Sequence, residues 1–362
     1  MIMARFILKR CFYGLLVLLG VITLVFILFN VLPGDPARMV MGQRSDIATL
    51  EAVNKDLGRD KPVLTQYFNF LNDLLPLSVH NDKNPESYWY LDPGKYPKNT
   101  QLFRFSTNNV LVLKAPYLRR SYQSQREVSD ILAEAFPKTI LLALVSIAFA
   151  MVVGILTGIM LAVWQNAVLN KVALVFSVLG MSLPSFFAAI LNAWIFAFVL
   201  ADVTGLNMTG SLFSVDDFGN GEYLDLKNLI LPAITLGIRP LAIVVELTRT
   251  SLKDVLSQDY IRTAKAKGLS RFRIIMGHAL KNAMNPVITA VSGWFASLLA
   301  GAVFVEYVFD WKGIGVVIVD ALEKYDFPVL MGAVMFISVL LVVINIMVDI
   351  IYAWLDPRIR LS

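Results

Sequence analysis

Residues 11–32 read CFYGLLVLLGVITLVFILFNVL, and none of them is charged. A helix needs about 20 mostly apolar residues to cross the hydrocarbon core of a bilayer, so this run predicts a membrane span. Basic residues precede the run, as in a signal peptide, but it is too long for the apolar part of one. It is also followed by Leu32-Pro33-Gly34-Asp35-Pro36 rather than by a cleavage site of small residues. We therefore expect a retained helix whose N-terminus lies in the cytoplasm.

The composition of the whole chain points to the same environment. Of 362 residues, 57% are hydrophobic and only 16% are charged, whereas soluble domains carry about 25% charged residues. The net charge of +5 is explained by basic cytoplasmic loops rather than by nucleic acid. The single cysteine, Cys11, excludes an internal disulfide, and it has no metal-ligand spacing to His80 or His278. The sequence therefore predicts an integral membrane protein without a metal or cofactor.

Five further apolar runs have the length of a membrane span. They cover residues 139–163, 172–200, 229–252, 286–304 and 329–355. The predicted fold is an all-α bundle of six transmembrane helices, which places both termini on the same side. The loop at 253–285 is basic and the loop at 201–228 is acidic, so the positive-inside rule puts the first loop and both termini in the cytoplasm.

This topology divides the chain into three parts. Residues 1–32 form the cytoplasmic N-terminus and the first helix, 33–138 an extracytoplasmic segment, and 139–362 the core of helices two to six. The segment 33–138 is polar and rich in turn formers, yet aromatic residues recur in it. A disordered tether would lack them. We therefore expect a small folded insertion over residues 74–119.

The loop between the fourth and fifth spans is the most informative part of the chain. We expect Ser257 to cap a helix at its start, Asp259 to face the positive helix end, and Gly268 to terminate the helix. Ser270 is then expected to cap a second helix. The residues alone leave an alternative open, in which this basic loop lies on anionic lipid.

The same loop resembles a known family. Ala264-Lys265-Ala266-Lys267-Gly268, followed by residues 278–283 (HALKNA) and Pro286-Val287, is similar to the coupling loop of ABC-importer permeases. The general family pattern begins Glu-Ala-Ala, and Arg262-Thr263-Ala264 stands there in this chain, as is usual in the oligopeptide/dipeptide/nickel branch. Further segments resemble the first, B-type permease of that branch. They are 32–36, 57–58, 66–67, 128–141, 349–352 and 355–360.

The resemblance implies a function and a set of partners. The chain would form half of the channel of an ATP-driven importer for di- or oligopeptides in the bacterial plasma membrane, working by alternating access. Its partners would be a sister permease, two ATP-binding subunits and an extracytoplasmic solute-binding protein. The loop would form the coupling helix that contacts the ATPase. The residues expected there are Asp259, Tyr260, Arg262, Ala264, Lys265 and Gly268.

Other functional classes fit the sequence less well. The chain has no Gly-x-x-x-x-Gly-Lys-Ser/Thr motif, so ATP would have to be bound by other subunits. A self-contained secondary transporter or channel would usually show internal inverted repeats, which are not evident. An intramembrane serine protease at Ser182 would need a base, and both histidines lie in loops. We expect Pro184 to kink the third span instead.

Charged residues inside the fourth span suggest a path for solute. Arg239 lies about 15 Å into the membrane, and Pro232 and Pro240 on either side are expected to bend the helix. Ionisable groups at this depth commonly mark a functional site, so Arg239 and Glu246 are candidate lining residues. The alternatives are an ion pair of Arg239 with Asp349 and a local salt bridge of Glu246 with Arg249. Gly154 and Gly158 predict close helix packing.

Overall fold

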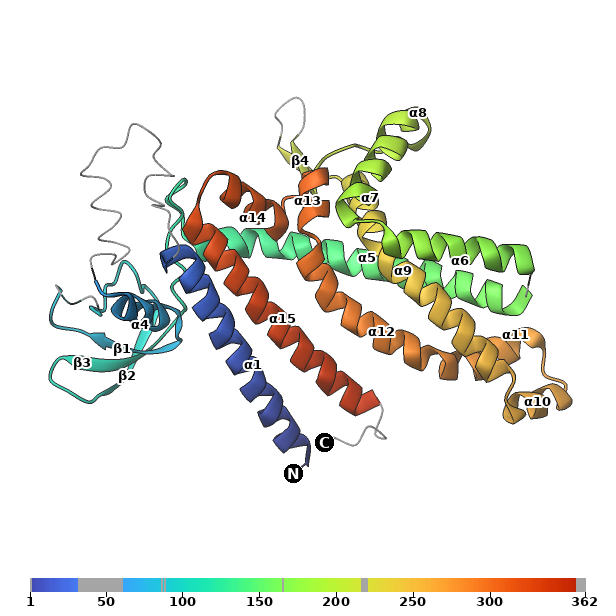
Figure 1. Ribbon diagram of the computed structural model, residues 1–362, viewed down its shortest axis with the longest axis horizontal. Helices are drawn as coiled ribbons and strands as arrows, with labels where there is room; N and C mark the ends of the chain where they lie inside the picture. Colours follow the sequence, from blue (N-terminus) through green and yellow to red (C-terminus); the bar gives the residue numbers. More distant parts are fainter. Residues whose placement is uncertain are drawn as a thin grey trace. The chain divides into compact units, whose positions relative to one another are not determined.

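The computed structural model describes residues 2–31, 61–85, 87, 89–164, 166–215 and 221–355 (Figure 1). The motifs at 32–36, 57–58 and 356–360 lie outside the described residues. The chain divides into two compact units. The first unit comprises residues 1–8, 135–316 and 343–362, and the second comprises 9–134 and 317–342.

In the described part of the chain, four helices are long and apolar enough to cross a membrane. They lie in α1 (Ile2–Phe26) with the π-helical turn η1 (Ile27–Val31), α5 (Val128–Trp164), α9 (Lys227–Leu256) and α15 (Phe327–Leu355). Two bent helix pairs bring the number to as many as six by length and composition. Each predicted run thus falls on a helix or helix pair. The second helix begins at Val128 rather than Thr139, because the polar turns before the apolar run are helical as well.

The kink expected at Pro184 is a break between two helices, which form the first bent pair. Helix α6 (Ala167–Ser182) ends at Leu183, and Pro184 precedes α7 (Ser185–Asn192), which continues as η3 (Ala193–Val199). The two halves meet at 113°. The second pair joins α12 (Leu280–Gly301) to α13 (Val303–Phe309) at 58°. By contrast, α9 is one continuous helix that contains both Pro232 and Pro240.

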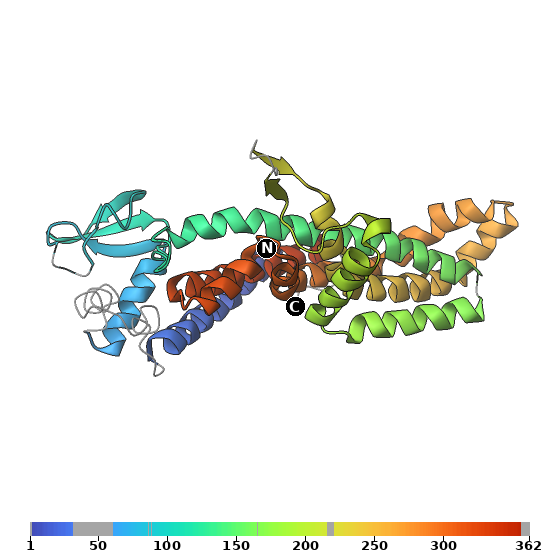
Figure 2. The same ribbon diagram turned by 90° about the horizontal axis from the view of Figure 1, so that it is seen from above.

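Helix α9 is the most buried of these four helices and packs against α6 and α12 (Figures 1 and 2). It also approaches α5 closely at the two glycines that predict close packing. A Cβ on Gly154 would lie 2.7 Å from Cγ1 of Val244, and one on Gly158 would lie 2.6 Å from Cβ of Thr248. Only glycine therefore allows this helix contact.

The turn between α13 and α14 (Ile314–Glu323) was not expected from the sequence. The Glu306 carboxylate is fully buried and accepts a hydrogen bond from the Gly315 N–H at 2.6 Å. The buried Trp311 indole donates to the Lys138 carbonyl at 3.0 Å, and the Ile314 N–H donates to Thr139 at 2.9 Å. These bonds fix the start of α14 against the first part of α5 inside the first unit.

Short strands complete the first unit. The acidic loop after η3 contains the four-residue helix α8 (Ala201–Thr204). It continues into a hairpin of β4 (Phe213–Val215) and β5 (Glu222–Leu224) that leads into α9.

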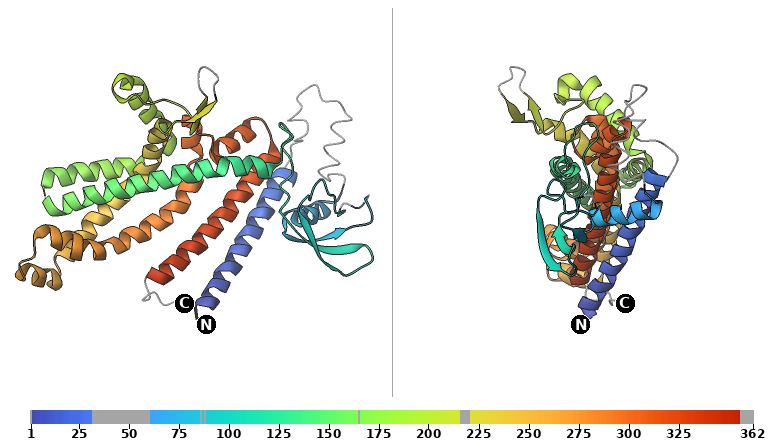
Figure 3. Two further views of the ribbon diagram at one scale, coloured as in Figure 1. Left: turned by 180° about the vertical axis from the view of Figure 1, so that it is seen from behind. Right: turned by 90° about the vertical axis from the view of Figure 1, so that its left-hand side faces the viewer.

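The second unit contains a folded element with a sheet. Helix α4 (Val63–Leu74) is followed by β1 (Leu77–Asn81), β2 (Asn99–Arg104) and β3 (Asn109–Lys114), which form an antiparallel sheet in the order β1-β3-β2 (Figure 3). Its core consists of Leu91, Tyr96, Val110 and Val112. The described residues of the aromatic-rich segment 74–119 thus contain an antiparallel sheet with its own small core.

A polar cluster is buried beneath this sheet. The Tyr96 hydroxyl donates to the Asp73 carboxylate at 2.6 Å, and the Lys114 ammonium donates to the Asp73 carbonyl at 2.7 Å. Burial raises the pKa of Asp73 and lowers the pKa of Lys114 to about 8. Burial, followed by the charge of Lys114, lowers the pKa of His80 to about 4. Burial therefore shifts the pKa of each of these three groups in the direction that favours its neutral form.

Candidate functional site

The loop between α9 and α12 folds into α10 (Asp259–Ala266), α11 (Arg271–Arg273) and η4 (Ile274–Ala279). The N-cap of α10 is Gln258, without a side-chain hydrogen bond. The predicted cap at Ser257 is wrong, because this residue is the C-cap of α9 and keeps helical backbone angles. Its hydroxyl donates to the Asp254 carbonyl at 2.7 Å. Asp259 lies in the first turn, as expected.

The end of α10 agrees with the sequence analysis. Gly268 has φ +77°, a left-handed conformation that glycine adopts without a steric penalty. Its N–H donates to the Lys265 carbonyl at 2.9 Å, and the Leu269 N–H donates to Ala264 at 3.3 Å. This pair of bonds is a Schellman motif. Ser270 then caps α11, where its hydroxyl accepts from the Arg273 N–H at 3.4 Å.

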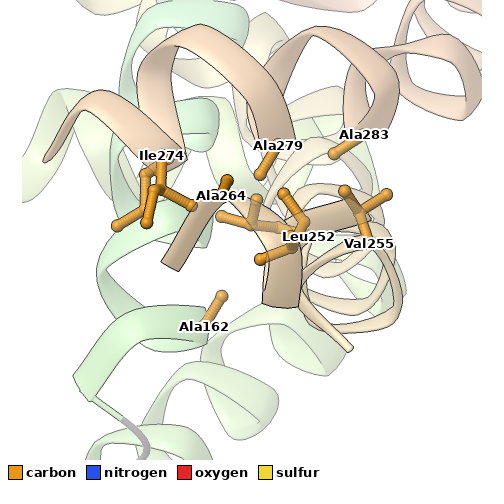
Figure 4. Close-up of a cluster of buried hydrophobic side chains, with 9 residues drawn as sticks. Ala162, Leu252, Val255, Ala264, Ile274, Ala279 and Ala283 are labelled. Atoms are coloured by element: carbon orange, nitrogen blue, oxygen red, sulfur yellow. The ribbon is translucent and has the colours of Figure 1, made fainter. Parts of the chain in front are cut away.

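Helix α10 is held by one hydrophobic cluster, drawn in Figure 4. From α10 the cluster contains Ile261, which is fully buried, and Ala264. The other members belong to the ends of neighbouring helices, namely Ala162, Leu252, Val255, Ile274, Ile275, Ala279 and Ala283. The cluster therefore joins α10 to α5, α9, η4 and α12, all within the first unit.

Polar contacts add to this attachment. The Asn282 amide of α12 donates to the Tyr260 hydroxyl at 2.9 Å. Arg271, just after α10, donates to the Val163 carbonyl at the end of α5 at 2.8 Å. Sequence reasoning missed Asn282 and Arg271 as contact residues. Their partners lie 22 and 108 residues away, and no local pattern signals such pairs.

The opposite face of α10 is exposed and carries charge. Asp259 and Arg262 form an exposed ion pair of 3.1 Å, and Lys265 and Lys267 are also exposed. Tyr260 is partly exposed, with 39% of its surface accessible. Of the six residues predicted for this site, Ala264 belongs to the buried face and Gly268 to the terminating turn. The remaining four form the surface that a partner could contact.

Arg239 lies at the break between α6 and α7. Its guanidinium donates to the Leu183 carbonyl at 3.0 Å, which supplies a partner to the end of α6 where Pro184 interrupts the helix. It also lines a cavity of about 60 Å³ together with Ser185, Thr235 and Trp294. Its Nε is buried without a hydrogen-bond partner among the described residues.

Glu246 and Asp349 are the two other charged residues that the sequence analysis considered together with Arg239. Among the described residues, Arg239 forms no ion pair, including the one with Asp349 that the sequence left open. Glu246 does not line the cavity. It pairs with Arg249 at 3.0 Å, and Arg249 also donates to Asn170 of α6 at 2.8 Å. The local salt bridge, one of the two alternatives for Glu246, is therefore confirmed.

The geometry defines a class of protein: a helical chain with candidate membrane spans whose ends hold a short helix with an exposed, charged face. Residues 154–361 match the family described as "Binding-protein-dependent transport system inner membrane component". Residues 3–84 match the N-terminal family of such membrane components. The chain belongs to this family. It is a multi-pass permease subunit of an ABC importer in the inner membrane and not an enzyme.

Curated relatives match over almost the whole chain. It is 34% identical to the glutathione transport system permease protein GsiC of Pectobacterium atrosepticum, with 99% of both chains covered. It is 32% identical to the probable D,D-dipeptide transport system permease protein DdpB of Escherichia coli, covering 97% and 96%. A structure of the inward-facing MetNI methionine ABC transporter is similar in fold, with a TM-score of 0.50 and 16% identity. That match covers 62% of this chain and 96% of that one.

Proposed function

We propose that this chain forms half of the translocation pathway of an ATP-driven importer for di- or oligopeptides, and that α10 is its coupling helix. The observation that carries the proposal is the two-sided construction of α10. One face is packed into the ends of α5, α9 and α12, and the other presents Asp259, Tyr260, Arg262 and Lys265 outward. A helix built in this way can bind an ATPase subunit and move the spans with it.

The contacts suggest how motion is transmitted. Because Ile261 is buried among residues of three spans, a displacement of α10 displaces their ends together. Arg271 extends the connection to the last turn of α5 through the Val163 carbonyl. Closure of the ATPase dimer would thus shift the bundle between inward- and outward-facing states, each stabilised by its own contacts.

The partners and topology follow from this role. The complex would contain a sister permease, two ATP-binding subunits and an extracytoplasmic solute-binding protein. Both termini and the loop at 253–285 would be cytoplasmic, and residues 33–138 extracytoplasmic. The sheet of that segment exposes Leu77, Phe103 and Leu113. Exposed apolar patches often mark protein contacts, and we assign this one to the solute-binding protein.

Peptides are the proposed solutes for two reasons. The relatives reported above are named as a glutathione permease and a probable D,D-dipeptide permease. In addition, Arg239 presents a buried N–H beside a cavity, and a peptide carries a carboxylate that a guanidinium binds well. We therefore place Arg239 on the translocation path. Glu246 would contribute to this path only by forming its ion pair with Arg249, near the cytoplasmic end of α9.

Reconstitution tests the function directly. The permease pair should take up a labelled dipeptide into proteoliposomes only when the ATPase subunits, ATP and the solute-binding protein are all present. A version with ATPase subunits unable to hydrolyse ATP is the control. Uptake by the permeases alone, driven by an ion gradient, would instead establish a secondary transporter.

A further inference from the structure

A second cavity lies in the second unit, beside two membrane spans. It has a volume of about 220 Å³. The lining residues come from α1, α4, the segment before α5, and α15. They are Leu18, Val21, Ile22, Leu74, Pro116, Leu118, Met335, Phe336, Ser338 and Val339. The one hydroxyl among them, that of Ser338, donates to the Val334 carbonyl of its own helix. The cavity is therefore apolar, and apolar cavities of this size stay dry and take up apolar molecules.

The position of α4 sets the depth of this cavity in the membrane. The hydroxyls of Tyr67 on α4 and Thr23 on α1 are 2.6 Å apart. Thr23 lies six residues before Phe29, where the first candidate span ends, so it is about 9 Å inside the span. Leu64 and Phe68 of α4 share one helix face and are 73% and 58% exposed. An amphipathic helix with this face fits the boundary between headgroups and acyl chains.

Arg119 lies beside the cavity and close to α4. It follows Leu118, which lines the cavity, and its guanidinium is 5.8 Å from the ring centre of Phe70. Phe70 packs in the same cluster as Val21, Leu74 and Met335. Among the described residues, the Arg119 guanidinium forms no ion pair or hydrogen bond. Asp73 interacts with it only at a distance, and burial raises the pKa of that carboxyl.

We propose that this cavity and Arg119 together form a binding site for one phospholipid. An acyl chain would occupy the apolar cavity between α1 and α15, and Arg119 would bind the phosphate at the membrane surface beside α4. The depth, the apolar lining and the positive charge at one end all match such a molecule, and a guanidinium binds phosphate with two parallel hydrogen bonds. This site shares no residue with α10 or with the cavity at Arg239, and it does not depend on which solute is transported.

Native mass spectrometry of the complete transporter tests the site, with dioleoyl phosphatidylglycerol titrated into detergent solution. Leu18→Trp fills the cavity, and Leu24→Trp is its control on an exposed position of the same helix. Arg119→Gln removes the phosphate ligand, and Arg120→Gln is its neighbouring control. Size-exclusion chromatography and ATPase activity confirm that each variant assembles.

We expect one tightly bound phosphatidylglycerol per copy of this chain in the wild type and in both controls. Arg119→Gln should weaken its binding about tenfold, because a charge-assisted hydrogen-bond pair is lost, and Leu18→Trp should abolish it. Equal lipid occupancy in wild type and both test variants would overturn the proposal. So would a loss in only one of them, or displacement of the lipid by inorganic phosphate alone.

Discussion

Replacing Ile261 by alanine should weaken the docking of α10 against the spans while leaving the bundle intact. The side chain is fully buried, and alanine lacks three of its carbon atoms. At about 0.8 kcal/mol for each buried methylene, the loss is roughly 2.4 kcal/mol before any cavity is counted. Ile261 and Ala264 are the only buried residues of the eight in α10, so the cost falls on the docking of this helix. The ratio of undocked to docked α10 should rise about fiftyfold.

The effect is measured on the complete transporter in proteoliposomes. Ile261→Ala should lower peptide uptake per ATP hydrolysed, and residues 259–266 should exchange their amide hydrogens faster. Ile261→Val removes one methyl group at a cost of about 1 kcal/mol, so it should give an intermediate effect. Thr263→Ala, on the exposed face of the same helix, is the matched control and should couple normally.

A clear result would refute this reasoning. If Ile261→Ala showed wild-type uptake per ATP together with faster hydrogen exchange, docking of α10 would not be needed for coupling. If exchange were also unchanged, the hydrophobic cluster would not be what holds the helix.

Three further predictions concern other parts of the chain. Gly158→Leu should lower the free energy of unfolding in detergent by about 1–3 kcal/mol, because a Cβ there would lie 2.6 Å from the facing helix. Gly20→Leu, with no atom within 4 Å of its Cβ, should not, and equal losses would contradict the packing argument. His80 has a pKa of about 4 in the folded element and about 6.5 unfolded, so its contribution to stability falls as the pH drops from 7 to 5. Pulse proteolysis should show that the wild type loses roughly 1–2 kcal/mol of stability relative to His80→Asn between pH 7 and pH 5. A stability difference that stays constant over this range would exclude the effect. Arg239→Gln should reduce uptake of peptides with free C-termini more than uptake of C-terminally amidated ones, whereas equal loss would leave Arg239 with only its contact at the helix break.

Much of the fold can be predicted from the sequence, because the length of an apolar run and the backbone conformation of a glycine depend on neighbouring residues only. The charge-free run at 11–32 predicts α1, and Gly268 predicts the end of α10, since a left-handed turn there favours a residue without a side chain. The assignment of Ser257 as a cap failed for a local reason as well. Ser257 is the C-cap of α9 and keeps helical backbone angles, so its hydroxyl bonds backward to the Asp254 carbonyl instead of forward into α10.

The rest depends on contacts between distant residues. The Arg271–Val163 bond joins positions 108 residues apart, and the break beside Pro184 places the Leu183 carbonyl against Arg239, 56 residues away. The sequence indicates that Arg239 is an unfavourable charge at membrane depth, but it does not indicate that the Leu183 carbonyl is its partner. It also missed α14, because the buried Glu306 that fixes its start reads in the sequence as a polar residue between two spans.

Cross-linking from α10 tests the central proposal most directly. A photoreactive p-benzoylphenylalanine at Lys265, on the exposed face of α10, is irradiated in the assembled transporter. The same residue at Lys324, in the exposed turn before α15, serves as the control. The proposed coupling role predicts an adduct between position 265 and an ATP-binding subunit, and none with that subunit from position 324. An adduct of position 265 with lipid alone would contradict it and would favour a loop that lies on the membrane surface.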